Sequence, residues 1–216
     1  MLTHSYSAIK LFENCPLRYY RQRVTKEVKD EDNEYTLYGS RIHKALENKL
    51  AKQEDLPKDM QKYEPLCDAI TRAAVGGDLL VEYQMTLNGN LESTGWFAKD
   101  AWLRSVLDVL VVKNDRAIVL DWKTGKRRPD FFQMQIFAAQ VFKVYPDVTT
   151  VDTSLVWLQT MAQDQERFER KDANLLWRDI LGRIKRIELA AENDTWTAKP
   201  SGLCKFCPCR HDCEYF

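Results

Sequence analysis

The sequence has no excess of charge of either sign. Its 216 residues include 32 lysines and arginines and 32 aspartates and glutamates, so the formal net charge at pH 7 is zero. Proteins that wrap nucleic acid over their whole surface usually carry a basic excess. The balance therefore argues against that mode of binding and leaves room only for local basic patches.

Long apolar runs are also missing. No stretch of about eighteen apolar residues occurs, so no membrane span is expected. The first residues, Met-Leu-Thr-His-Ser-Tyr-Ser, lack the charged and then apolar pattern of a secretion signal, and we expect an intracellular, cytoplasmic protein. Internal repeats and low-complexity segments are absent. What remains, 44% hydrophobic and 30% charged residues, is an ordinary globular composition with enough length for a sizeable core.

The order of the predicted elements indicates an α/β fold in which a central mixed β-sheet is flanked by helices. Helices are expected over 5–25 with a break at Pro16, from about 38 to 52, and over 57–74, 130–144 and 171–193. Strands are expected over 79–87, in a hairpin within 105–126, and over 151–158 and 166–170. We expect a single domain over 1–216, made of a helical part (1–75), a sheet with its helix (76–160), a long helix (171–193) and a cysteine-rich tail (200–216).

The stretch 105–126 is the most informative part of the chain. It reads as two β-branched apolar runs joined by a polar turn at Asn114-Asp115, which suits a tight hairpin. In that register Lys113 faces Arg116, and Asp108 faces Asp121, with Cβ atoms roughly 5 Å apart.

Lys123 lies two residues beyond Asp121 and so points to the same face. Two carboxylates this close repel each other unless a cation or a proton lies between them. The hairpin therefore predicts a divalent-metal site with an ammonium group beside it; a salt-bridge cluster on a solvated face is the alternative.

Several other features stay open on residue chemistry alone. His43 and Glu47 are four residues apart and share a helix face, but a lone helical histidine is usually structural. A basic stripe that includes Arg18 and Arg21 is either a solvated helix face or a patch that contacts phosphates. Four of the six cysteines fall within residues 204–216, which points to metal binding because structural disulfides are rare in a reducing compartment.

Four short motifs together resemble one family. They are Gly39-Ser-Arg-Ile-His43, Asp108, Asp121-Trp-Lys-Thr-Gly125 and Gln133-Met-Gln-Ile-Phe137, in that order. The chain resembles the PD-(D/E)xK nuclease superfamily, and within it the RecB-like branch: the RecB and AddB nuclease domains, the CRISPR-adaptation nucleases and small phage exonucleases. Phe137 departs from the tyrosine of the last motif, so any role of that hydroxyl is lost or moved.

The resemblance implies a restriction-endonuclease-like core and a role for each motif residue. His43, Asp108, Asp121 and the backbone carbonyl of Trp122 would bind Mg²⁺ or Mn²⁺, with the imidazole favouring Mn²⁺. Lys123 would orient the attacking water and stabilise charge on the phosphate, and Gln133 would position Lys123 or the substrate. The expected catalytic set is Lys123, Asp108, Asp121 and Gln133. Phosphates flanking the cut would contact Arg18, Arg21, Arg127 and Arg128.

The cysteines resemble the iron–sulfur clasp of AddB and the CRISPR-adaptation nucleases. There, one early cysteine joins three late ones, which here implies a [4Fe–4S] cluster on Cys15, Cys204, Cys207 and Cys213. A local Zn²⁺ site that uses Cys209 or His211 in place of Cys15 is the alternative.

The resulting expectation is a metal-dependent DNA exonuclease, a hydrolase of phosphodiester bonds, that acts on DNA ends or single strands. Recombination, replication or CRISPR adaptation would be its setting, and a phage origin would suit it. Two alternatives stay open: a catalytically silent module that binds DNA ends, and a structure-specific endonuclease.

Overall fold

A computed structural model describes residues 2–30 and 33–215. Its centre is a five-stranded sheet in the order β1-β2-β3-β4-β5. Neighbouring strands are antiparallel except β3 and β4, which are parallel, so the sheet is mixed as predicted. The strands are β1 (Asp78–Leu87), β2 (Leu103–Lys113), β3 (Arg116–Lys123), β4 (Thr150–Trp157) and β5 (Ala162–Glu169).

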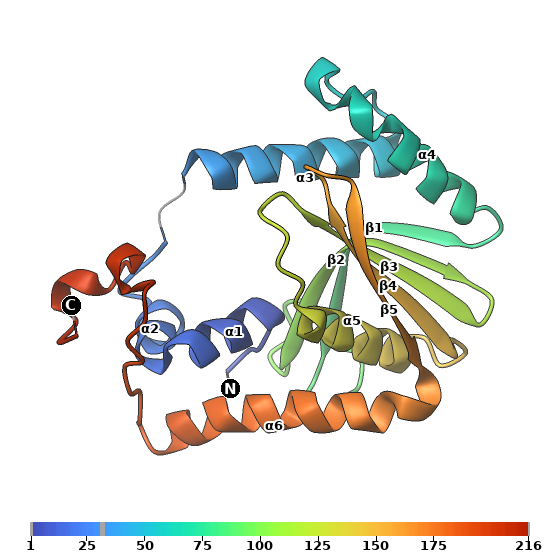
Figure 1. Cartoon of the computed structure of the whole chain (residues 1–216). Coiled ribbons are helices and arrows are strands. Elements are labelled where there is room, and N and C mark those ends of the chain that lie inside the picture. Colours follow the sequence, from blue (N-terminus) through green and yellow to red (C-terminus); the bar gives the residue numbers. More distant parts are fainter. Residues whose placement is uncertain (1, 31–32, 216) are drawn as a thin grey trace.

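Helices cover both faces of the sheet (Figure 1). They are α1 (Tyr6–Asn14), α2 (Pro16–Tyr19), α3 (Glu34–Lys52), α4 (Glu64–Ala73), α5 (Phe131–Val144) and α6 (Ala173–Glu192). Short turns of other helix types are η1 (Tyr20–Val24), η2 (Lys58–Tyr63), η3 (Arg170–Asp172), η4 (Cys204–Phe206) and η5 (Arg210–Asp212). The predicted α/β class with a sheet flanked by helices is confirmed.

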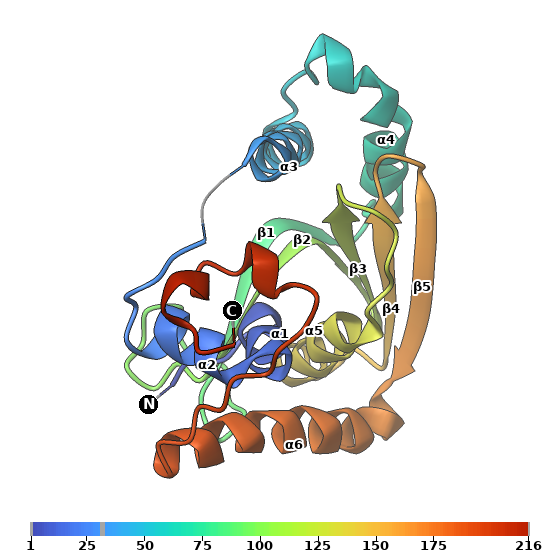
Figure 2. The ribbon, with the colours of Figure 1, turned by 60° about the vertical axis from the view of Figure 1, so that its left-hand side comes forward.

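Each face of the sheet has its own apolar core. On one face, Ile42 and Leu46 of α3 pack with Val109 of β2 and Trp122 of β3. On the other face, α5 packs through Met134 and its neighbours against the opposite sides of the same strands. A third core joins α5 to α1 and α6, which lie beyond it (Figures 1 and 2).

The helix boundaries differ from the prediction in two places. α3 begins at Glu34, one turn before the expected start near residue 38, because the Asn33 side chain accepts hydrogen bonds from the backbone N–H groups of the first turn. The segment 57–74 is a 3-10 turn followed by α4, because Pro65 in the first turn of α4 has no N–H with which to continue a helix from the preceding segment. The Ser5 side chain caps α1, and the Asp130 side chain caps α5.

The cysteine-rich tail lies beside α1 and α2, although nearly two hundred residues separate them in the sequence; both views show the red C-terminal segment against the blue helices (Figures 1 and 2). Residues 27–36 are rich in charge. Their last three residues belong to α3, and residues 31–32 lie outside the described residues. Over residues 2–30 and 33–215, no helix is both long and apolar enough to cross a membrane.

Candidate functional site

The central hairpin has the predicted turn and register. Asn114 has a positive φ of 53°, as a tight turn requires, and Lys113 pairs with Arg116. The backbone ladder between β2 and β3 ends at Val109 and Leu120, one step before Asp108 and Asp121 would pair. The carboxylate of Asp108 instead accepts a hydrogen bond from the backbone N–H of Trp122, at 2.6 Å. The two aspartates are neighbours without being a ladder pair.

A local distortion of β1 and β2 explains this change. In β2, Leu107 packs in the core beneath α5 whereas Val109 packs in the core beneath α3. Residues two apart in a regular strand share a face, so the alternation shifts by one residue at Asp108. Glu82, across from Asp108 in the register of β1 and β2, has a positive φ of 49° and is also missing from the paired residues. The distortion turns both carboxylates toward α3.

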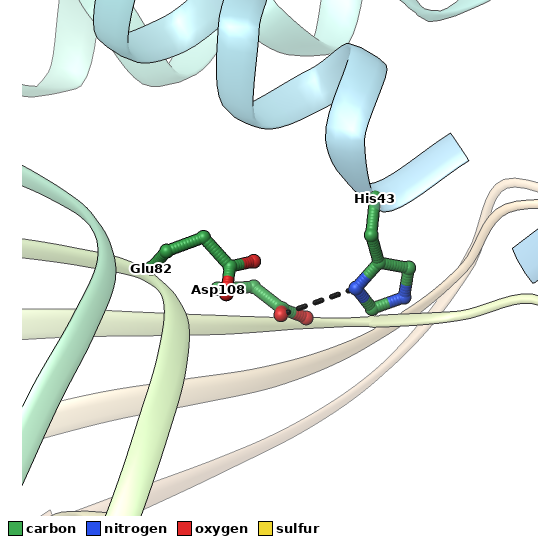
Figure 3. Close-up of side chains that lie close together, drawn as sticks. All are labelled: His43, Glu82 and Asp108. Carbon is green, nitrogen blue, oxygen red and sulfur yellow. Dashed lines mark ion pairs between the residues drawn. The ribbon is translucent and has the colours of Figure 1, made fainter. Parts of the chain in front are cut away.

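The two redirected carboxylates meet a histidine from the helix above them. Ligand atoms of His43, Glu82 and Asp108 all lie within 4.8 Å of one another. Figure 3 shows the three side chains pointing toward one another, with Nδ1 of His43 3.3 Å from Oδ1 of Asp108. An imidazole and two carboxylates form a donor set that fits a divalent cation.

Asp121 and Lys123 form the other half of the site, on the side of α5. Lys123 Nζ lies 2.6 Å from Oδ2 of Asp121. Gln133 at the start of α5 joins the two: its side-chain N–H donates to Oδ1 of Asp121 at 2.8 Å, and its carbonyl oxygen accepts from Lys123 Nζ at 2.8 Å. The Oδ2 atom of Asp121 is buried and faces the Lys123 ammonium. A carboxylate oxygen has more than one lone pair, so this atom can also serve as a metal ligand.

The charges of the two halves act on each other. Burial raises the pKa of Asp121 to about 6; Lys123 opposes the shift, and Asp108 adds to it. Burial also raises the pKa of the Glu82 carboxyl, and the Asp108 carboxylate raises it further. The pKa of His43 lies above its ordinary value because its hydrogen bond with Asp108 and the surrounding carboxylates outweigh burial. This crowding of negative charge is what a bound cation would relieve.

Gly39 lets α3 approach the end of β3. A Cβ atom at this position would lie 2.9 Å from Oγ1 of Thr124, which directly follows Lys123. The helix carrying His43 therefore sits against the end of β3 at the one residue without a side chain. Gly39 therefore permits the close packing of α3 against the end of β3, and the same helix carries His43 to the two carboxylates.

Glu82 is the residue that the sequence prediction missed. The predicted metal ligands were His43, Asp108, Asp121 and the Trp122 carbonyl; the structure brings His43 and Asp108 together, with Glu82 as the third member of the group. The signal was present, because Glu82 interrupts the apolar strand Leu-Leu-Val-Glu-Tyr as Asp108 interrupts its own. Trp122 contributes its N–H to Asp108 and its buried side chain to the core beneath α3.

Three of the four predicted phosphate-binding arginines are engaged within the protein. Arg18 pairs with Asp30 at 2.6 Å, and Arg127 pairs with Asp164 of β5. Arg21 donates to the backbone oxygen of Asp212 at 3.1 Å and so ties η1 to the tail. Arg128 is exposed. These contacts fix where the three guanidinium groups lie, and the spacing in the sequence did not indicate the partners.

The cysteines predicted to act together line one cavity. Cys15 at the end of α1 and Cys204, Cys207 and Cys213 of the tail all face it, and Cys209 also lines it. Backbone N–H groups point at two of the sulfurs: Lys199 donates to Cys15 at 3.5 Å and Ser201 to Cys204 at 3.2 Å. Cys67, the remaining cysteine, is buried in the core beneath α3.

Comparison with known proteins agrees with this geometry. The model of the PD-(D/E)XK nuclease superfamily matches residues 3–214, and the chain belongs to that superfamily. A putative exonuclease from Eubacterium rectale is similar in structure, with a TM-score of 0.56 and 16% identity over 98% of this chain and 88% of the other. The structure titled SSO0001 has a TM-score of 0.50 and 13% identity over 100% of this chain and 87% of the other. None of the curated proteins matches the chain.

Proposed function

We propose that this nuclease is a divalent-metal-dependent DNA exonuclease of the RecB-like branch. One observation carries the proposal: a candidate metal-binding group lies next to an ion pair in a chain of the nuclease superfamily. The metal-binding group consists of His43, Glu82 and Asp108. The ion pair is formed by Asp121 and Lys123. The four motifs that resemble the RecB-like branch supply every residue of the two groups except Glu82. The resemblance to a putative exonuclease supports the same fold.

His43, Glu82, Asp108 and Asp121 would hold Mg²⁺ or Mn²⁺. When bound, such an ion polarises the scissile phosphate and lowers the pKa of a water molecule beside it. Carboxylate oxygens suit either ion, and the imidazole favours Mn²⁺.

Lys123 and Gln133 have complementary tasks in this site. The Lys123 ammonium is half-buried next to Asp121 and can stabilise negative charge that develops on the phosphate oxygens. Gln133 holds the ammonium through its carbonyl oxygen and Asp121 through its amide N–H, which fixes both groups before substrate arrives. Gln133 is therefore a positioning residue in this proposal.

We test the function by digestion of DNA labelled at the 5′ or the 3′ end, single- or double-stranded, with Mg²⁺, with Mn²⁺ and with a chelator. The wild type should release labelled product only with a metal ion, and Lys123→Ala should fold normally but lose cleavage. An equal rate in that variant contradicts the assignment. A circular substrate that survives while its linear form is degraded supports exonuclease action; cleavage of the circle would favour a structure-specific endonuclease.

We also propose that Cys15, Cys204, Cys207 and Cys213 hold a [4Fe–4S] cluster. Their common cavity and the backbone N–H groups beside two of the sulfurs support this. A zinc ion about 2.3 Å from each thiolate would bring the sulfurs to roughly 3.8 Å of one another. Across residues 2–30 and 33–215, no three cysteine sulfurs lie within 4.8 Å of one another, which favours a larger inorganic group.

The cluster would join the two ends of the chain. The Cys15→Ser variant should then bind neither iron nor sulfide. Its melting temperature should be lower than that of the wild type, because the tail would no longer be fixed to α1. Protein purified without oxygen should be brown, with a broad visible absorbance band. Cys67→Ser, which alters a thiol in the core beneath α3, is the control and should keep the iron. A colourless protein with one zinc ion would contradict the cluster.

A further inference from the structure

A second hollow lies beside the catalytic residues, on the side away from α3. It has a volume of about 440 Å³ and is lined by the start of the chain, η1, the loop before β2, β2 and α5. We call it the Trp96 pocket, after the aromatic side chain on its wall. Its volume falls within the range of about 300–1,000 Å³ that is usual for small-ligand sites.

Three residues that line the pocket have buried polar atoms without a hydrogen bond. Ser105 is 6% exposed and His4 is 1% exposed, yet Oγ of Ser105 and both ring nitrogens of His4 make no hydrogen bond. Nε2 of His4 faces a carboxylate oxygen of Glu188 on α6, at 3.8 Å. Nε of Arg104, from the same strand, is also buried without a hydrogen-bond partner. Buried polar groups are nearly always hydrogen-bonded, so the unpaired atoms within this wall mark it as polar rather than as part of an apolar core.

The wall of the pocket combines positive charge with an aromatic face. The Arg104 guanidinium carbon lies 5.2 Å from the centroid of the Trp96 ring, and Arg23 of η1 reaches the same hollow. Guanidinium groups bind phosphate through paired N–H donors, and aromatic rings stack on nucleobases. A nucleotide has both a phosphate for the guanidinium groups and a base for the aromatic ring, so it is the ligand class that matches this wall.

The pocket is connected to the reacting groups through one side chain. Gln133 lines it and also hydrogen-bonds Lys123 and Asp121. On the other side of the site, a groove beneath α3 is lined by His43, Glu82 and other residues. A strand that crosses the catalytic residues therefore has a hollow on either side of the bond to be cut.

We propose that the Trp96 pocket binds the terminal nucleotide of the DNA strand, with its phosphate on Arg104 and its base against Trp96. This inference rests on the proposed function, because the ligand is part of the DNA substrate. A terminal phosphate at the 5′ end and one at the 3′ end present the same chemistry, and the experiment separates them.

The test measures DNA binding by fluorescence anisotropy in the Lys123→Ala background, where strands are not degraded. Single-stranded oligonucleotides carry a phosphate at the 5′ end, at the 3′ end or at neither, with the dye at the opposite end. One terminal phosphate should tighten binding by about tenfold, and Arg104→Gln should abolish this preference. Trp96→Ala should weaken binding of every oligonucleotide by on the order of tenfold. Arg167→Gln, on the distant strand β5, is the matched control and should change neither.

The outcomes separate this inference from the function on which it rests. Melting temperatures first establish that each variant is folded. Unchanged affinity and unchanged phosphate preference in Arg104→Gln and Trp96→Ala, while the wild type degrades DNA, would overturn the pocket and leave the nuclease function standing. A wild type that neither binds nor degrades DNA would overturn both.

Discussion

Replacing Glu82 by glutamine tests the composition of the metal site. The change removes one negative charge and keeps the shape of the side chain. Ligand atoms of Glu82 and Asp108 lie within 4.8 Å of each other. Two unit charges at that distance repel by about 3 kcal/mol at an effective dielectric constant of about 20 and by about 1 kcal/mol in water. Glu82 is half-buried, so its repulsion should fall between these limits.

The substitution should therefore have opposite effects with and without metal. In a chelator at alkaline pH, where the His43 ring has lost its proton, Glu82→Gln should raise the melting temperature by on the order of 2 to 12 °C, because about 1 to 3 kcal/mol of repulsion is relieved. With Mn²⁺, the variant should need at least about tenfold more metal for half-maximal activity, since even groups that only support a ligand alter metal affinity by about 10- to 100-fold.

Calorimetric melting and a metal titration of DNA cleavage measure the two effects. Glu166→Gln is the matched control, because burial raises the pKa of that carboxyl but it is not part of the metal group. The control should leave the metal dependence of cleavage unchanged. A Glu82→Gln protein with the metal dependence of the wild type would refute the place of Glu82 in the site.

Two further predictions concern neighbouring residues. Burial raises the pKa of Asp121 to about 6 from an ordinary 3.8, so the folded state binds this proton more tightly than the unfolded chain does. With a chelator present, the free energy of unfolding should therefore fall as the pH rises from about 4 to about 6. Thermal melts of Asp121→Asn should lack this part of the pH dependence. The Gly39→Ala variant should keep the helix, as circular dichroism would show. Its cleavage rate should fall by up to about tenfold, because the new Cβ displaces Thr124 next to Lys123. An unchanged rate would contradict this contact.

The sequence predicted the central hairpin well because its signals are local. The Asn114-Asp115 turn and the pairing of Lys113 with Arg116 depend only on turn chemistry and on the period of two in a strand. The cap of α5 at Asp130 was predictable for the same reason.

The arrangement of the carboxylates was not predictable in the same way. At Glu82 and Asp108 the alternation of side chains between the two faces of the sheet shifts by one residue, because β1 and β2 are distorted together. A prediction from strict alternation along a strand does not include such a distortion. The ion-pair partners of the surface arginines could not be predicted either. Asp164, for example, lies on β5, which comes close to Arg127 only in the folded chain. Short-range patterns identified the motif residues, and tertiary packing decided which of them meet.

The central claim is that the carboxylate group of this site supports metal-dependent cleavage of DNA. The most direct measurement is the rate at which linear end-labelled DNA is degraded in Mn²⁺ by the wild type, by Asp108→Asn and by Asp152→Asn. Asp152 is the matched control, because its carboxylate pairs with Arg116 and Arg167 and is not in the metal group. We expect a wild-type rate in the Asp152 variant and a loss of at least about 100-fold in the Asp108 variant. Equal rates in all three proteins would contradict the account.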